Sequence, residues 1–219
     1  MNKIFFVVFC LLFTNLSFAT AMDTALQNIE SKWELAEHNY PENQRKQEFI
    51  SLLKQARNLA AKFPNKAEPL ILQACIILTR AKIESSFNAL ASAHKAKDLL
   101  EQAIAINPKA DRGSAFVTLG VLYYKVPGWP IAFGDNSKAE AMLKKALSIN
   151  PRGIDSNYYY AEYLLSQNKS EQAARYLAKA VMAPLHKPKL FSKTIKAKAK
   201  KALNDISTLL ASNGNANSL

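Results

Sequence analysis

The segment SKAEAMLKKALSINP, residues 137–151, decides how this chain folds. Within it Ala139, Leu143 and Ala146 recur at helical spacing, so their side chains lie on one face of a helix. The two alanines let a neighbouring helix approach that face closely. Pro151 then ends the helix, because proline cannot continue the backbone hydrogen bonds and constrains the residue before it. The segment therefore predicts a helix that packs tightly against a partner helix.

The same pattern occurs three times along the chain. Its other copies are Ala96, Leu100 and Ala103 before Pro108, and Ala173, Leu177 and Ala180. A helical pattern that recurs in this way indicates an array of stacked helical pairs. The composition agrees, because the 219 residues are rich in Ala, Leu and Lys and contain only 6 glycines. Such a composition favours helix over sheet.

A second pattern precedes these helices and carries a family resemblance. It consists of Leu119, Gly120 and Tyr123 in one repeat, and of Tyr160, Ala161 and Leu164 in the next. Together with the alanine pattern, it makes residues 64–184 similar to the tetratricopeptide-repeat family. The spacing from Ala139 to Ala173 is 34 residues, which is the period of that family. The spacing from Ala96 to Ala139 is 43 residues, because extra residues stand at 126–136.

The resemblance implies an all-α fold, a tetratricopeptide-like array of helical pairs (an α-solenoid) with a C-terminal capping helix. We expect a signal peptide at 1–19, an atypical helical pair at 20–64, three tetratricopeptide-like pairs at 65–184, a basic helix at 185–212 and a disordered tail at 213–219. The expected helices are 22–39, 42–63, 67–85, 91–106, 112–125, 137–149, 155–167, 170–182 and 189–211. Inserts are expected near 86–90 and at 126–136.

The N-terminus has the pattern of a secretory signal peptide. Lys3 supplies the positive start, residues 4–13 are an unbroken apolar run, and Ala19 ends a small-residue cleavage site before Thr20. Cleavage predicts an exported, periplasmic protein. The alternative is a retained membrane anchor, for which the apolar run is short, since a span needs about 20 apolar residues. Cys10 lacks the small-residue context of a lipid-attachment site.

Positive charge is concentrated near the C-terminus. The formal net charge of the chain is +12, and seven lysines lie within residues 187–201, with no acidic residue before Asp205. One interpretation is a capping helix whose lysines face solvent. The other is peripheral contact with an anionic membrane or an acidic partner. Nucleic acid is a natural partner for so basic a chain, but export argues against it.

No catalytic or metal-binding constellation stands out in the sequence. His38, His94 and His186 are scattered, without metal-ligand spacing, and there is no Gly-rich phosphate loop. Cys75 stands alone in an apolar run, either as a small buried residue or as a reactive or disulfide-forming thiol. We therefore expect a protein that is not an enzyme and that holds no cofactor or metal.

The insert VPGWPIAFGDN at 126–136 is the least generic stretch. Its prolines stiffen it, and Asp135 or Asn136 is placed to cap the following helix. We expect Trp129 and Phe133 to bury against something, and two arrangements are open. They either plug the space between neighbouring helical pairs, or fold over the concave face and wall a ligand pocket.

In tetratricopeptide repeats the first helix of each pair lines a concave groove. By position, this resemblance places Val117, Val121, Tyr124, Lys125, Asp155, Tyr158, Glu162 and Leu165 in the groove, and Tyr123 and Tyr160 in packing positions. Tyrosine suits a partly wet groove, because it offers apolar area and a hydroxyl. The alternative is that these tyrosines only fill gaps between helices.

These observations predict a non-catalytic, exported scaffold that binds a protein or peptide partner through its concave groove. The candidate partner-binding residues are Tyr124, Lys125, Trp129, Phe133, Asp155, Tyr158 and Glu162. The alternative function is that of a small-solute-binding accessory protein of a periplasmic transport system, with the Trp129 loop as the pocket wall. The insert also resembles that of periplasmic proteins of this fold, including accessory components of tripartite solute transporters.

Overall fold

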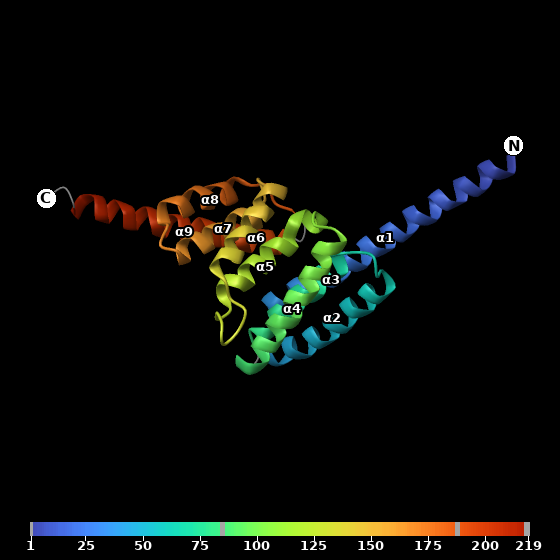
Figure 1. Ribbon diagram of the computed structural model, residues 1–219, viewed down its shortest axis with the longest axis horizontal. Helices are drawn as coiled ribbons and strands as arrows, with labels where there is room; N and C mark the ends of the chain where they lie inside the picture. The colour runs from blue at the N-terminus through green and yellow to red at the C-terminus, as the bar shows by residue number, and fades with distance from the viewer. Residues whose placement is uncertain (1, 84–85, 187–188, 217–219) are drawn as a thin grey trace.

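The computed structural model describes residues 2–83, 86–186 and 189–216, with side chains for 21–83, 88–186 and 191–209. The elements are α1 (Asn2–Asn39), α2 (Glu42–Lys62), α3 (Glu68–Ala81), α4 (Ser86–Ile106), the 3-10 turn η1 (Ala110–Gly113), α5 (Ser114–Lys125), α6 (Asn136–Ile149), α7 (Ile154–Ser166), α8 (Ser170–Met182) and α9 (Lys189–Ala216). Figure 1 shows the described chain as an all-α arrangement in which α1 and α9 extend outward at opposite ends. This confirms the predicted fold class.

Consecutive helices pack as pairs, α3 with α4, α5 with α6 and α7 with α8. The predicted pattern lies in these contacts, since all nine of its residues have no exposed area: Ala96, Leu100, Ala103, Ala139, Leu143, Ala146, Ala173, Leu177 and Ala180. Gly120 shows how close the helices come. A Cβ atom at this position would lie 2.6 Å from Cγ of Leu143, so the α5–α6 contact leaves no room for a side chain.

The helix bounds correct predictions at the ends of several elements, among them α3, which ends at Ala81 and not at residue 85. Helix α4 begins at Ser86, so residues 86–90 form its first turns and no insert. Leu90 and Ala93 extend the apolar face of the helix toward its N-terminus, which explains the longer helix. Helix α9 continues to Ala216, because no proline follows Pro188 to end it. Residues 213–216 are therefore helical, and the rest of the predicted tail, 217–219, lies outside the described residues.

The predicted signal peptide lies on the first half of α1. The helix runs from Asn2 without a break through residue 20, whereas the prediction began it at Met22. Met1 and the side chains of residues 2–20 lie outside the described part of the structure. Among the described residues, no helix combines the length and the apolar character needed to cross a membrane.

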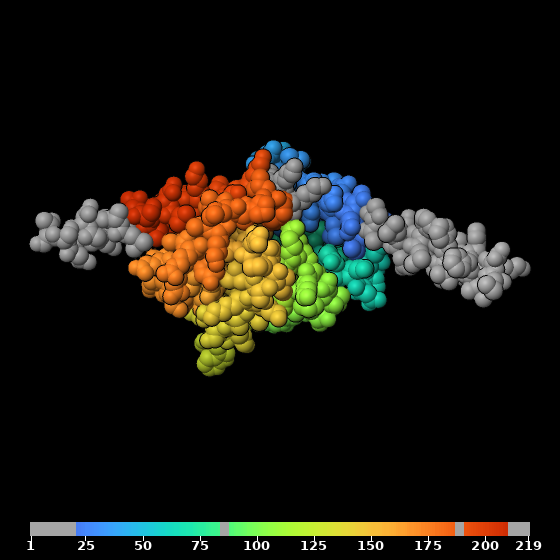
Figure 2. Space-filling model, turned by 90° about the horizontal axis from the view of Figure 1, so that it is seen from above, coloured from blue at the N-terminus to red at the C-terminus, as the bar shows by residue number. Residues whose placement is uncertain are grey.

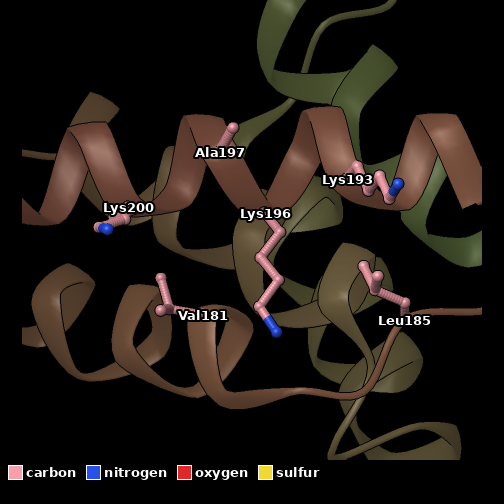
Figure 3. A pocket seen from close by; sticks show the side chains of 6 residues that line it. All are labelled: Val181, Leu185, Lys193, Lys196, Ala197 and Lys200. Atoms are coloured by element: carbon pink, nitrogen blue, oxygen red, sulfur yellow. The ribbon is translucent and has the colours of Figure 1, made fainter.

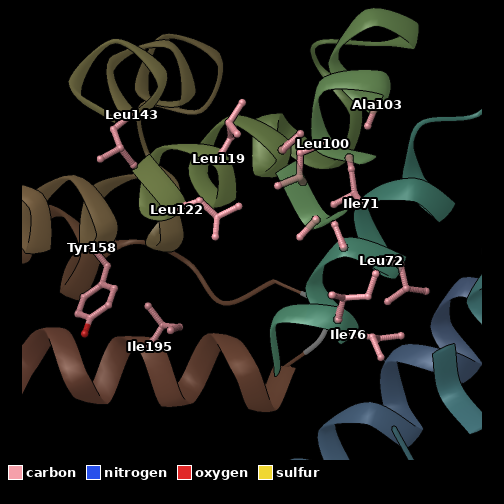
Figure 4. Close-up of a cluster of buried hydrophobic side chains, with 14 of the residues drawn as sticks. Ile71, Leu72, Ile76, Leu100, Ala103, Leu119, Leu122, Leu143, Tyr158 and Ile195 are labelled. Atoms are coloured by element: carbon pink, nitrogen blue, oxygen red, sulfur yellow. The ribbon is translucent and has the colours of Figure 1, made fainter. Parts of the chain in front are cut away.

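The first helices of the pairs form an inner row together with the C-terminal helix, in which α1, α3, α5, α7 and α9 each contact the next. The two ends of this row also touch. The rings of Trp33 in α1 and Phe191 in α9 are 4.6 Å apart, and the backbone N–H of Phe191 donates to Oε1 of Glu34 at 2.8 Å. Figure 4 shows the side chain of Tyr158 in α7 pointing toward α9, with Ile195 of α9 beside it. Helix α9 therefore covers part of the face that was predicted to be open.

Candidate partner-binding site

Asp155, a predicted groove residue, belongs to a polar network that joins three parts of the chain. Nε2 of His186 lies 3.1 Å from Oδ2 of Asp155, and Nη2 of Arg112 lies 2.8 Å from Nδ1 of the same imidazole. Arginine can only donate, so Nδ1 accepts and Nε2 carries the proton that binds Asp155. The network ties η1, the start of α7 and the segment after α8. Asp155 thus has a structural partner.

Acidic side chains surround this network. Burial, followed by the charges of Asp111 and Glu34, raises the pKa of Glu30 to about 7, although Arg112 and His186 act in the opposite direction. Desolvation by the surrounding protein also raises the pKa of Asp111, although 44% of the side chain remains accessible to solvent. We call Glu30, Asp111, Arg112, Asp155 and His186 the inner cluster.

The backbone of η1 brings Asp111 and Arg112 into this cluster in an unusual conformation. Their φ angles are 41° and 54°, and that of Gly113 is 81°. Two consecutive non-glycine residues in the left-handed region are strained, and their surroundings must hold them there. The contacts of Arg112 with Asp111, at 3.5 Å, and with His186 supply part of that restraint.

Cys75 lies close to the same inner face. Its Sγ atom is 3.9 Å from Oγ1 of Thr118, and burial raises the pKa of the thiol far above its ordinary value. The group is therefore a protonated thiol at neutral pH, which is a poor nucleophile and a poor metal ligand. Within the described residues, no group of three or more His, Cys, Asp or Glu side chains is arranged to hold a metal ion.

The structure brings four of the predicted groove residues together between α5 and α7. Nζ of Lys125 lies 5.0 Å from the centre of the Tyr124 ring. Burial first, then the carboxylate of Glu162, raises the pKa values of Tyr124 and Tyr158. Tyr158 is 7% exposed. It therefore offers a partner almost no surface, and the interpretation that such tyrosines fill gaps between helices holds for it.

The predicted groove and packing positions outside this group are also largely covered. Val117 is buried, and Tyr123 and Tyr160 are buried as predicted for packing positions. Val121 and Leu165 are partly exposed. The inner face of the first helices is thus mainly a packed surface.

The loop between α5 and α6 is held at its base by Phe133. The Phe133 ring lies 4.7 Å from the ring of His94 in α4 and 5.9 Å from that of Tyr123 in α5. Lys97 of α4 lies over its face at 5.9 Å. Phe133 therefore fills the space between two helical pairs, which is the first of the two predicted arrangements.

Backbone hydrogen bonds fix the rest of the loop. Gly134 donates to the carbonyl of Pro127 at 2.8 Å, and Asp135 donates to that of Tyr123 at 2.8 Å. Oδ1 of Asp135 accepts from the backbone N–H groups of the first turn of α6, at 2.9 and 3.0 Å. This confirms Asp135 as the helix cap. The loop is closely packed at Gly134, where a Cβ atom would overlap the carbonyl oxygen of Val126.

The end of this loop points into solvent. Trp129 is 89% exposed and Ile131 is 70% exposed, and Figure 2 shows the loop as a lobe projecting from the body of the molecule. The prediction that Trp129 buries against something is wrong, and so is its role as the wall of a pocket. The reason is that the internal hydrogen bonds of the loop hold the Trp129 side chain away from the helices. We call residues 127–131 the Trp129 tip.

Ile131 was missed by the sequence reasoning. Its signal was available, since an isoleucine directly after Pro130 in a ten-residue connection has no helix face to pack on. The Trp129 tip thus combines a large aromatic and a branched aliphatic side chain on a loop whose base is fixed by hydrogen bonds and by Phe133. Among the predicted site residues, Trp129 and Lys125 are the ones that a partner can reach most readily.

Comparisons with known proteins bear on the fold. Residues 131–185 match the family model described as tetratricopeptide repeat. The crystal structure of TTC0263, a thermophilic tetratricopeptide-repeat protein of Thermus thermophilus, is similar with a TM-score of 0.55 and 21% identity, over 88% of this chain and 95% of that one. This similarity supports the fold alone.

Two crystal structures of MamA are more distant. Both are 14% identical to this chain, with TM-scores of 0.45 and 0.46. The first covers 80% of this chain and 95% of that one, and the second covers 84% and 90%. No curated protein matches the chain.

Proposed function

We propose that this chain, a tetratricopeptide-repeat protein, is a non-catalytic scaffold that binds a protein partner through the Trp129 tip. The observation that carries the proposal is the 89% exposure of Trp129 on a loop whose base is fixed. Tryptophan is among the residues that most often dominate the binding energy of protein interfaces. A partner that covers this side chain would remove a large apolar area from water, which favours binding.

The rigidity of the loop supports the same function. Because Phe133 and Gly134 hold the loop in one conformation, little conformational entropy is lost when the tip enters a partner. Preorganisation of this kind favours affinity. The loop also lies on a helical scaffold, and loops positioned by a rigid scaffold often carry the binding residues of a protein.

The shape of the tip favours a protein partner over a small solute. A projecting pair of apolar side chains fits a concave apolar pocket on another protein, whereas a solute site needs a concave wall. The residues of the predicted groove give less support, because Tyr158 and Val117 are buried and Asp155 is paired with His186. We therefore place the binding surface on the loop.

Export remains part of the proposal. It rests on the signal-peptide pattern of residues 1–19, with Lys3, the apolar run 4–13 and the cleavage site before Thr20. A partner would then be a periplasmic or envelope protein, and nucleic acid would not be a partner. The test is the N-terminal residue of the protein recovered from its native host, which is Thr20 if the segment is removed as proposed.

Binding through the tip is tested by affinity capture from an envelope extract of the native host. The bait proteins are the unchanged chain, Trp129→Ala, and Ile50→Ala as a matched control on α2, where Ile50 is 50% exposed. We expect the unchanged chain and Ile50→Ala to capture equal amounts of the same partner. Trp129→Ala should capture about tenfold less of it, or less still, as for a hot-spot tryptophan. Equal capture by all three baits would contradict the proposal.

A further inference from the structure

Helices α8 and α9 border a surface hollow of about 480 Å³. Figure 3 shows the six side chains that line it, with the three lysines on α9 and the apolar Val181 and Leu185 on the opposite side. The lining residues are Val181, Leu185, Lys193, Lys196, Ala197 and Lys200. The hollow is thus basic on one side and apolar on the other.

The lysines share one side of α9 because of their spacing. Lys193, Lys196 and Lys200 stand at positions i, i+3 and i+7, which fall on one face of a helix. Nζ of Lys196 donates to the carbonyl of Ala183 at 2.8 Å, which directs this side chain across the hollow toward the end of α8. The positive charges are therefore held at the hollow by the helix and by one fixed contact.

Carboxylates do not neutralise this face. The sequence has no Asp or Glu between Glu171 and Asp205. In the part of the chain that the structure describes, no ion pair joins Lys193, Lys196 or Lys200 to a carboxylate. Three ammonium groups around one hollow repel one another, and an anionic group placed between them would relieve that repulsion.

One exposed apolar side chain lines the hollow together with the lysines, and another follows Val181 directly in the sequence. Leu185 lines the hollow and is 44% exposed, and Met182 at the end of α8 is 83% exposed. A surface that offers both ammonium groups and exposed apolar side chains matches the interface of an anionic bilayer, where phosphates and acyl chains lie next to each other. An acidic protein segment would pair with the lysines, but its carboxylates alone would leave Met182 and Leu185 in water.

We propose that this face, the α8–α9 lysine face (Val181, Met182, Leu185, Lys193, Lys196 and Lys200), docks peripherally on an anionic phospholipid surface. A headgroup phosphate enters the hollow, and Met182 and Leu185 enter the boundary with the acyl chains. The inference is independent of the proposed function of the Trp129 tip, which lies between α5 and α6. It assigns the basic C-terminal helix a lipid partner in addition to its packing role.

The test is a flotation assay, in which the full chain, purified from its native host, is mixed with lipid vesicles. One set contains only neutral phosphatidylcholine, and the other contains about one third phosphatidylglycerol. The test variant replaces Lys193, Lys196 and Lys200 by Gln. The matched control replaces three lysines by Gln at exposed sites elsewhere on the chain, namely Lys46, Lys54 and Lys66. All proteins carry the same N-terminus, so any contribution of the N-terminus to vesicle binding is equal in all of them.

We expect the unchanged chain and the control to bind the anionic vesicles and to be released by salt. The test variant should bind about a hundredfold more weakly, because each lysine near an anionic surface contributes roughly fivefold. Met182→Gln should weaken binding severalfold without changing the salt dependence.

Three results would overturn the inference. One is equal binding to both kinds of vesicle, and another is an equal loss in the test variant and the control. The third is binding to a poly-glutamate peptide without binding to anionic vesicles, which would assign the face to an acidic protein. Circular dichroism of each variant ensures that a loss is not caused by unfolding, because Lys196 contacts the end of α8.

Discussion

The α5–α6 and α7–α8 connections perform the same structural task with very different lengths. Between α7 and α8 the chain turns within Gln167, Asn168 and Lys169, with Asn168 at a φ of 58°. Between α5 and α6 it uses residues 126–135. The helices on either side pack alike in both pairs, since Leu143 and Leu177 are both fully buried.

A long connection is therefore unnecessary for packing the second helix of a pair on the first. A turn of three residues already places one such second helix on its first helix. The extra residues instead anchor Phe133 between two pairs and project Trp129 and Ile131 into solvent. The features that the two pairs share therefore serve stability, and the long loop is the part to which our proposal gives a binding role.

The first prediction compares how much the buried leucines of the α5–α6 and α7–α8 pairs contribute to stability, and it has the largest expected effect. Leu143→Ala and Leu177→Ala should each lower the free energy of unfolding by about 2–5 kcal/mol, because both side chains are fully buried and leave a cavity. Urea unfolding followed by circular dichroism measures both. If one variant lost several kcal/mol and the other almost none, the two pairs would not be equivalent.

The next effect concerns the shape of the long loop. Gly134→Ala places a Cβ atom on top of the carbonyl oxygen of Val126, so the loop must move. We expect the loop of this variant to be cleaved faster in limited proteolysis. We also expect the variant to capture no partner, although Trp129 is still present. Gly128→Ala is the matched control, because its Cβ atom would lie at an ordinary 3.4 Å from the oxygen of Gly134. Loss of capture in both variants would argue against a shape effect.

The pH dependence of stability separates the inner cluster from the loop. Glu30 has a pKa of about 7 in the folded chain and a lower one, near 4.5, when unfolded. The folded state therefore holds its proton more tightly, and stability is lost as the pH rises from about 4.5 to 7. Glu30→Gln should remove this loss and raise Tm at pH 8 by a few degrees, while partner capture stays unchanged. An unchanged slope of Tm against pH would contradict the assignment.

The smallest expected effect is on the stability of the Trp129 tip. Trp129→Ala should change the free energy of unfolding by less than about 0.5 kcal/mol, because the exposed side chain makes few contacts to lose. The same urea experiment measures it. A loss of about 2 kcal/mol or more, of the order seen for buried aromatic side chains, would mean that the side chain packs on the helices and is part of the core.

The repeat core could be predicted from the sequence because its determinants are local. The Ala139, Leu143 and Ala146 pattern fixes one helix face, and all three residues are fully buried. The contact of α1 with α9 could not be predicted in this way. Phe191 and Glu34 are 157 positions apart, and no local pattern indicates that the ends of the inner row meet.

The candidate site was predicted in part. Trp129 was selected as an unusual residue of the insert, but its burial was inferred from its apolar character. That inference fails because apolar side chains also make up much of a protein surface. Asp155 was selected from its position in the repeat, whereas its pairing with His186 depends on how the segment after α8 returns to η1.

Photo-crosslinking in the native host tests whether the long loop binds a partner. A photoreactive phenylalanine replaces Trp129 in one strain and Lys169, in the short α7–α8 turn, in the other. Both positions are exposed. We predict that position 129 forms a crosslink to one partner protein, that Gly134→Ala abolishes this crosslink, and that position 169 does not form it. The same crosslink from both positions, or none from position 129, would contradict the assignment of binding to the long loop.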